Sequence, residues 1–290
     1  MKKLLVSLSI LSTMMFSSCS KNINESEINK NRLITPKSLN FIGVEHNKGL
    51  DFIYNGLKNG RINNGENATF SITTLQDRQE VLDLVEEQTH NYIDNNYPQD
   101  PTLSLAHQLI SSVCTEDFVS SVNGGLYNNQ LVTSITSNEV QFLDQLNVIL
   151  SDDDNSITSI ISRIEQLEMT ASTFSDEEKY VVFSASVVAK NSFSYWNEHF
   201  DDWQNLFHSN NFNLGTLSTG NLGSSGNYQT LGAVNWKNVG KADVAGAVGG
   251  AIRSGVGLFF GPVGWGSFGL SVIGTALGGS GTAAVYQWLQ

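Results

Sequence analysis

An all-α fold is predicted for this chain of 290 residues: a helical bundle followed by a glycine-zipper-like helical hairpin at the C-terminus. Apolar residues in the body recur at intervals of three and four, which places them on one face of a helix. Signals for strands are few, and regular helical stripes without strands indicate a bundle. The last 50 residues combine apolar residues with many small ones, a composition typical of helices that pack closely.

The body of the predicted bundle, residues 41–208, contains successive amphipathic segments separated by turn or capping residues. Ser175 and Glu178 have the Ser-x-x-Glu spacing of a capping box and begin the last segment. A linker rich in Gly, Ser and Asn follows at residues 209–236. The predicted helices cover residues 44–57, 75–95, 102–122 with a break near Cys114, 157–167 and 176–196. A further helix is predicted to have Ser137 or Asn138 as its N-cap and to run to residue 150.

The C-terminal segment, residues 237–290, carries no charged side chain after Arg253. Residues four apart share a helical face, so small residues at that spacing form a groove in which another backbone can lie. The GxxxG pairs are Gly246 with Gly250, Gly257 with Gly261, and Gly274 with Gly278. A longer ladder of small residues comprises Ser267, Ser271, Thr275, Gly279 and Ala283.

A turn divides this segment into two helices, predicted over residues 241–260 and 266–289, because Pro262 is flanked by glycines. Each half has about 20 residues, or about 30 Å as a helix, which matches the hydrocarbon thickness of a bilayer. Aromatic residues near the turn and at the far end suit a membrane interface. Three interpretations remain open at this point: a membrane-inserting hairpin, a hairpin buried in the protein's own core, and a disordered tail.

The N-terminus has the layout of an export signal, with two lysines, a short apolar run and small residues that end at Cys19. Residues 16–19, Phe-Ser-Ser-Cys, resemble the lipobox of bacterial lipoproteins. The resemblance implies that residues 1–18 are removed as a signal peptide, that the Cys19 thiol is lipidated, and that Ser20 favours sorting to the outer membrane. The alternative is a plain secretory signal with an incidental cysteine. The polar residues 19–40 are expected to form a flexible tether.

The formal net charge of the chain is −12, and its negative charge lies in the body. Beyond residue 236 the chain holds Lys237, Lys241 and Arg253 against Asp243 alone. An acidic body argues against nucleic acid as a partner and against adhesion to anionic lipid through the body's surface. The weakly cationic tail is the part that an anionic membrane attracts. The opposite charges also allow the body to hold the tail against itself until something releases it.

Two stretches of the body, residues 45–53 and 178–196, resemble segments of uncharacterised lipoproteins from Bacteroidota-type bacteria. In those proteins a helical body is likewise followed by a glycine-rich tail. The tail of this chain is similar to the glycine-rich, GxxxG-bearing helices of class II bacteriocins. These resemblances imply a surface-exposed protein with a membrane-seeking segment, and membrane lipid as its partner.

Residue types that carry catalysis are scattered along the chain. Glu87 and His90 have the Glu-x-x-His spacing that di-iron bundles use, but the sequence has no second copy of that motif. Cys114 lies among apolar residues, which is typical of a core position. We therefore expect no catalytic site, metal or cofactor. Two function hypotheses follow: a lipid-anchored protein whose tail enters membranes, and a surface-anchored binding or structural module whose tail is part of its own core.

Overall fold

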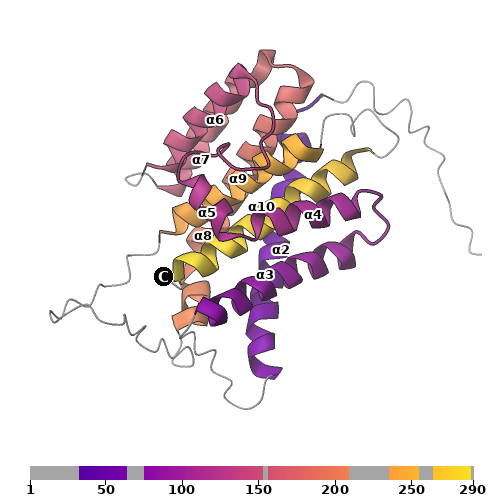
Figure 1. Cartoon of the computed structure of the whole chain (residues 1–290). Helices are drawn as coiled ribbons and strands as arrows, with labels where there is room; N and C mark the ends of the chain where they lie inside the picture. Colours follow the sequence, from indigo (N-terminus) through magenta and orange to yellow (C-terminus); the bar gives the residue numbers. More distant parts are fainter. Residues whose placement is uncertain (1–32, 64–74, 153–155, 209–234, 255–263, 289–290) are drawn as a thin grey trace, which may run out of the picture. The chain divides into compact units, whose positions relative to one another are not determined.

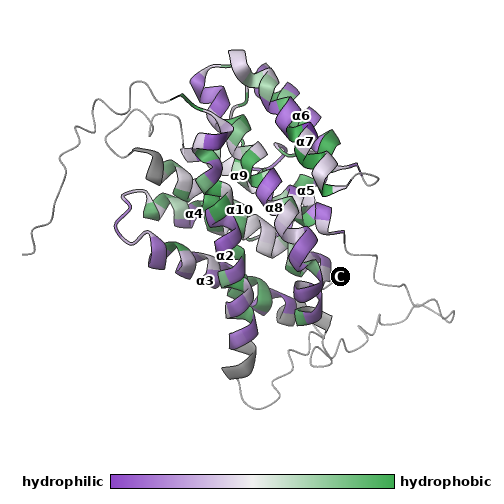
Figure 2. Cartoon of the chain, turned by 180° about the vertical axis from the view of Figure 1, so that it is seen from behind, coloured by the Kyte–Doolittle hydropathy of each residue, from purple (hydrophilic) through white to green (hydrophobic). Residues whose placement is uncertain are grey.

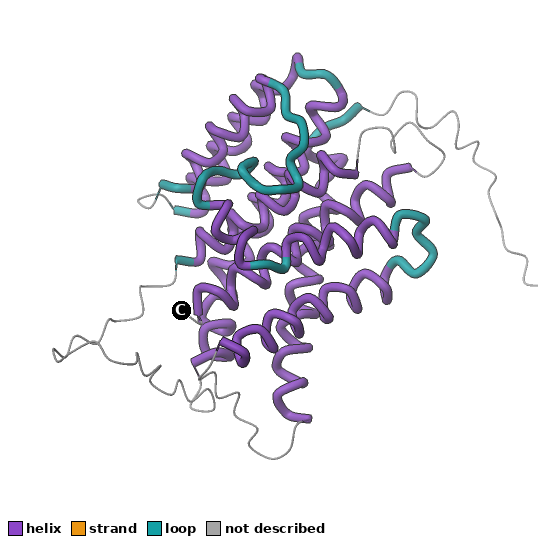
Figure 3. The backbone as a smooth tube through the Cα atoms, in the orientation of Figure 1, coloured by secondary structure: helices purple, strands orange, loops and turns teal. Residues whose placement is uncertain are grey.

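A computed structural model of the chain describes residues 33–63, 75–152, 156–208, 235–254 and 264–288 (Figure 1). Every regular element in these ranges is helical, which confirms the all-α prediction (Figure 3). The elements are α2 Pro36–Asn63, α3 Leu75–Asn96, α4 Leu103–Val113, α5 Glu116–Val122, α6 Ser137–Leu150, α7 Ile157–Thr170, the short 3-10 helix η1 Ala171–Thr173, α8 Asp176–His208, α9 Trp236–Ser254 and α10 Gly264–Trp288.

Some predicted features lie outside the described residues. They are the signal peptide with Cys19, most of the predicted tether and linker, and the Gly257–Gly261 pair. Ser267 belongs to α10, but its side chain is outside the described part of the chain.

The first described helix, α2, begins at Pro36, inside the stretch that was expected to be a tether. Local hydrogen bonds explain this start. The Thr35 N–H donates to Ser38 Oγ at 3.0 Å, and the Ser38 N–H donates to Thr35 Oγ1 at 3.1 Å. Pro36 occupies the first helical position, where its missing N–H would have no partner in any case. The folded part therefore begins before residue 41.

A break interrupts the third predicted helix at the expected place, near Cys114. The helix α4 ends at Val113, and α5 begins at Glu116. Thr115 stands between them as the N-cap of α5, because its side chain accepts a hydrogen bond from the Phe118 N–H at 3.2 Å. One predicted helix is thus two.

The N-cap of α6 is Thr136, and the prediction of Ser137 or Asn138 for this role was wrong. Thr136 has extended backbone angles, and its hydroxyl accepts from the Glu139 N–H at 3.2 Å while the Thr136 N–H donates to Glu139 Oε2 at 2.7 Å. The reciprocal pair is a capping box. The sequence-based prediction assigned the N-cap to one of the two residues after Thr136 and overlooked the Thr-x-x-Glu spacing of Thr136 and Glu139.

The capping box predicted for the last body helix is present. The Ser175 N–H donates to Glu178 Oε2 at 2.9 Å, and the Glu178 N–H donates to Ser175 Oγ at 3.2 Å. The helix that follows, α8, continues past the predicted end at residue 196 to His208.

The helix α10 is the centre of the bundle. It packs against α9 along its length and also against α2, α3, α4, α5 and α8 (Figure 1). Every residue from 268 to 285 is buried. The outer helices α3, α6 and α7 expose hydrophilic residues beside hydrophobic ones (Figure 2). This contrast follows from geometry, because a helix enclosed on all sides needs apolar or small side chains around its whole circumference, whereas a covering helix needs one apolar face.

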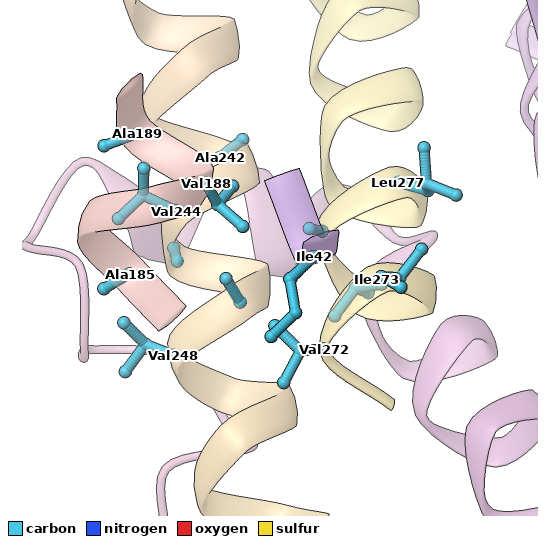
Figure 4. Close-up of a cluster of buried hydrophobic side chains, with 14 of the residues drawn as sticks. Ile42, Ala185, Val188, Ala189, Ala242, Val244, Val248, Val272, Ile273 and Leu277 are labelled. Atoms are coloured by element: carbon cyan, nitrogen blue, oxygen red, sulfur yellow. The ribbon is translucent and has the colours of Figure 1, made fainter. Parts of the chain in front are cut away.

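Side chains from four helices meet in the core around α10 (Figure 4). Val272 and Ile273 of α10 lie near Ile42 of α2, with Val244 of α9 and Val188 of α8 on the other side of the cluster. All five are at most 1% exposed. Burial of one such side chain contributes about 1.5–3 kcal/mol to folding, so the tail is a main source of the fold's stability.

Both helices of the tail hairpin begin before the predicted positions. The helix α9 begins at Trp236 rather than at residue 241, and α10 begins at Gly264 rather than at residue 266. The described residues from 33 onward belong to one compact unit, in which α9 and α10 pack with the helices that precede them.

Candidate functional site: the buried tail helices

Two glycines let α9 cross α10 at close range. A Cβ atom at Gly246 would lie within 3.0 Å of the Thr275 backbone, and one at Gly250 would lie within 3.0 Å of the Ser271 carbonyl. Real Cβ atoms essentially never come so close to such atoms. The first GxxxG pair of α9 therefore faces the ladder of small residues on α10.

The same ladder continues toward the C-terminus. At Gly279 a Cβ atom would lie 3.0 Å from the Ala242 carbonyl oxygen of α9 and 2.8 Å from the Phe118 ring of α5. The hydroxyl of Thr275 donates within its own helix to the Ser271 carbonyl at 2.7 Å. A hydroxyl that bonds its own backbone can be buried without a partner on another helix.

The GxxxG pair of α10 faces a different neighbour. A Cβ atom at Gly274 would lie 3.0 Å from the Ile110 side chain of α4. At Gly278 it would lie 2.8 Å from Val113 and 3.0 Å from the Cys114 sulfur. The small residues of α10 thus form two grooves, one for α9 and one for α4. The sequence predicted both sets of small residues but could not assign a neighbour to either.

A polar cluster that sequence reasoning missed fastens α9 to the body. Asp243 is fully buried, and its Oδ2 atom accepts hydrogen bonds from Ser192 Oγ and from Trp196 Nε1, the latter at 3.0 Å. His46 of α2, also fully buried, places Nε2 3.6 Å from the same oxygen. The signal available in the sequence was that Asp243 is the one acid in an otherwise apolar and basic tail.

Burial sets the protonation of this cluster. It raises the pKa of Asp243 to about 7, although hydrogen bonds from Ser192, Ser280 and Trp196 act in the opposite direction. Burial also lowers the pKa of His46 to about 4, against a smaller effect of its hydrogen bond with Asn47. The separation of His46 and Asp243 is that of an ion pair, but the imidazole is neutral at pH 7 because a charge on it would be desolvated.

The cluster contains a serine, a histidine and an aspartate, yet its geometry does not suit catalysis. Ser192, His46 and Asp243 are all 0% exposed, so a substrate cannot reach them. The Ser192 hydroxyl donates its hydrogen bond to the Asp243 carboxylate and not to His46, so the histidine is not placed to act as a general base for the serine. The arrangement can hold and exchange a proton inside the core, and it ties α9 to α8.

A second polar group joins α3 and α4 at the surface. The Nδ1 atoms of His90 and His107 are 2.5 Å apart, and each outer Nε2 atom faces a carboxylate: Glu86 at 3.4 Å for His90, and Asp94 at 2.9 Å for His107. The sequence motif paired Glu87 with His90, but the carboxylate that faces His90 in the structure belongs to Glu86. Within the described ranges, no group of three or more His, Cys, Asp or Glu side chains could hold a metal ion.

The lone cysteine of the described part, Cys114, is free and buried, as its apolar neighbours predicted. Burial raises its pKa to about 12, and the nearby Glu86 charge acts in the same direction. A thiol with that pKa is protonated at pH 7 and is a poor nucleophile.

Comparison with known proteins adds no assignment: no protein-family model, no curated protein and no solved structure matches the chain. Among the described helices, α10 has a stretch of 21 residues, Phe268–Trp288, that is long and apolar enough to cross a membrane. Its most apolar window of 18 residues is completely buried inside the bundle.

Proposed function

We propose that this chain is an exported, lipid-anchored envelope protein whose helical bundle shields a membrane-seeking helix, α10, and presents it to a membrane when the covering helices open. The observation that supports the proposal most is α10 itself, which is free of charged side chains, apolar or small around its circumference and of bilayer length, yet enclosed by other helices. A helix of that kind is stable either in a protein core or in a bilayer. Cys19, through its lipobox-like setting, would keep the protein next to a membrane.

Within the tail, α10 rather than the whole hairpin is the segment that would cross a bilayer. The helix α9 carries Lys237, Lys241, Asp243 and Arg253. A charged side chain at the centre of a bilayer costs about 2.5–3.5 kcal/mol on insertion scales. Because Asp243 takes up a proton near neutral pH, its own charge is the easiest of the four to remove. We expect α9 to remain at the interface while α10 enters the lipid.

A second candidate function is a surface-anchored binding or structural module in which the hairpin never leaves the core. The close approach of α9 to α10 at Gly246 and Gly250 supports it, because such packing is specific to one arrangement. The buried hydrogen bonds from Ser192 and Trp196 to Asp243 support it as well. In this case α10 is apolar only because it lies at the centre of the bundle, and its composition has no relation to a membrane.

A covalent lock between α10 and α4 can separate the two candidates. The Cβ atom of a cysteine at position 278 would lie 3.0 Å from the native Cys114 sulfur. This is close to the separation of about 3 Å that an S–S bond of about 2.0 Å produces between a Cβ atom and the far sulfur. Gly278→Cys combined with Val113→Ala, which makes room for the new side chain, provides the variant. The chain is used from Ser20 onward, so that the acyl anchor is absent and residues 33–290 remain complete.

The measurement is flotation with dye-loaded anionic liposomes, under conditions that open the cover, such as mild urea. We expect the reduced variant to float and release dye, and the oxidised variant to remain in solution, with reduction restoring flotation. The same molecule in its reduced form is the control for the substitutions. Flotation of the locked form to the same extent, or failure of the reduced form to float under any opening condition, would contradict the proposal and favour the permanent-core module.

A further inference from the structure

We infer that the imidazole rings of His90 and His107 form a binding site for a divalent transition-metal ion such as Zn²⁺, and that the bound ion fastens α3 to α4. This inference goes beyond the proposed function and holds whether or not α10 enters a membrane. His90 belongs to α3 and His107 to α4, and their Nδ1 atoms face each other at 2.5 Å. Both helices pack on α10, so an ion between the rings holds two of the helices that cover α10 in place (Figure 1).

The outer nitrogens of the pair determine where each neutral ring carries its hydrogen. A carboxylate only accepts hydrogen bonds, so a ring nitrogen that bonds to one must be the protonated nitrogen. Nε2 of His107 lies 2.9 Å from Asp94 Oδ1. Nε2 of His90 lies 3.4 Å from Glu86 Oε1 and 3.5 Å from Ser111 Oγ, whose own hydrogen is donated to Glu86. Each neutral ring therefore presents a bare Nδ1 lone pair to the other.

Two lone pairs at this distance repel each other, so the pair needs a proton or a metal ion between the rings. Charge favours the metal. In the described part of the chain, each of the two carboxylates, Glu86 and Asp94, lies within ion-pair distance of a histidine and of no lysine or arginine. Metal-bound imidazoles are neutral, so a dication between the rings balances both carboxylates, whereas one shared proton leaves a negative charge in excess. A carboxylate that accepts the far N–H of each ligating histidine is also the usual companion of a metal site.

The ion fits between the rings after a small movement. Zinc binds a histidine nitrogen at about 2.0–2.1 Å with tetrahedral angles, which places two ligating nitrogens about 3.3 Å apart. The Nδ1 atoms must therefore move roughly 0.8 Å farther apart than their present 2.5 Å. The side chains of His90 and His107 are 24% and 30% exposed, so the rings can turn and water can reach the remaining coordination positions. Among the described residues, no third imidazole, thiol or carboxylate joins the pair as a ligand.

Calorimetric titration with Zn²⁺ tests the site in the chain from Ser20 onward, prepared without a histidine tag. Excess Mg²⁺ is present throughout, because Mg²⁺ prefers oxygen ligands and so competes at the acidic surface but not at imidazole nitrogens. Wild type is compared with His90→Gln/His107→Gln, whose helical fold is checked by circular dichroism. His199→Gln is the matched control, because His199 also lies near a carboxylate, Asp202 at 3.8 Å, but belongs to α8.

We expect one Zn²⁺ per chain in wild type and in His199→Gln, and loss of this binding in the double variant. Nitrogen NMR of the rings tests the same site without a substitution: the Nδ1 signals of His90 and His107 should shift when Zn²⁺ is added, while each Nε2 keeps its hydrogen. Equal zinc binding in the double variant would overturn the site. Zinc binding in wild type no stronger than in the double variant would also overturn it, and would leave a shared proton as the link between the rings.

Backbone hydrogen exchange shows whether the ion fastens the two helices. At free Zn²⁺ of about ten times its Kd, we expect exchange in α3 and α4 to slow by roughly tenfold in wild type, because the ion binds only the closed arrangement. The double variant should show no such slowing. Unchanged exchange in zinc-loaded wild type would contradict the fastening of α3 to α4. Flotation in mild urea without metal tests the proposed function separately, so either proposal can fail while the other stands.

Discussion

The two tail helices are alike in composition but differ in what holds them. Both are rich in glycine and both are buried, yet α10 has no charged side chain, whereas α9 carries a buried aspartate that binds Ser192 and Trp196 of α8. Most contacts of α10 are apolar and steric, and its hydrogen bonds to other elements lie in its C-terminal part, where Ser280 bonds Asp243, Tyr286 donates to Glu116 and Gln287 accepts from the Asn235 N–H. The difference suggests that α9 is fixed to the body by buried polar contacts, and that α10 is held mainly by the burial of apolar surface and by shape, which a bilayer can replace.

The largest effect is expected where the two helices touch through backbone. Gly246→Ala places a methyl group against the Thr275 backbone, which cannot yield without moving a helix, so we expect a loss of roughly 2–4 kcal/mol of unfolding free energy. This loss should appear even though alanine favours helix by about 1 kcal/mol. Urea unfolding of the purified protein provides the measurement.

The matched control is Gly269→Ala, in α10. Its methyl group would meet the Phe41 ring, which is 37% exposed and can move outward. We expect its unfolding free energy to remain within about 1 kcal/mol of wild type. Equal losses in the two variants would show that the α9–α10 crossing is no tighter than the rest of the packing.

An effect of comparable size that depends on pH is expected at the polar anchor of α9. Asp243→Asn leaves His46 as the buried titrating group, whose pKa of about 4 lies below its ordinary value of 6.5. The stability linked to His46 is present above pH 6.5 and is lost as the pH falls toward 4, so the variant should lose on the order of 3 kcal/mol relative to its value at neutral pH.

His46→Asn provides the opposite case. Asp243 then remains, and its contribution is present at low pH and is lost as the pH rises through about 7. The pH slope of the wild-type unfolding free energy should lie between the slopes of the two variants. Unfolding free energies measured in urea from pH 4 to about pH 8 give these slopes, and parallel slopes in all three proteins would show that the cluster does not couple to folding.

The sequence predicted the helices well because their signals are local. The Ser175–Glu178 capping box and the break at Cys114 are properties of neighbouring residues, and the structure has both. Neighbouring residues in the sequence could not predict whether α10 lies in a protein core or in a membrane. An apolar helix in a core and one in a membrane require the same composition, so only its neighbours in space distinguish them.

The polar sites were beyond sequence reasoning for a related reason. His46 and Asp243 belong to α2 and α9, near opposite ends of the described chain, and no spacing rule relates them. His90 and His107 are closer in sequence, but their contact depends on how α3 and α4 turn about the loop between them. The Glu-x-x-His motif drew attention to His90 for metal binding, whereas the structure pairs that ring with a second imidazole.

Backbone hydrogen exchange tests most directly whether α10 leaves the bundle for a membrane. The chain from Ser20 onward is measured with and without anionic liposomes, under conditions such as mild urea that loosen the helices covering α10. We expect α3 and α4 to lose protection when liposomes are present while α10 keeps it, because α10 exchanges one apolar environment for another. Identical protection of α3, α4 and α10 with and without lipid would contradict this expectation, and would show that α10 stays in the core that the structure describes.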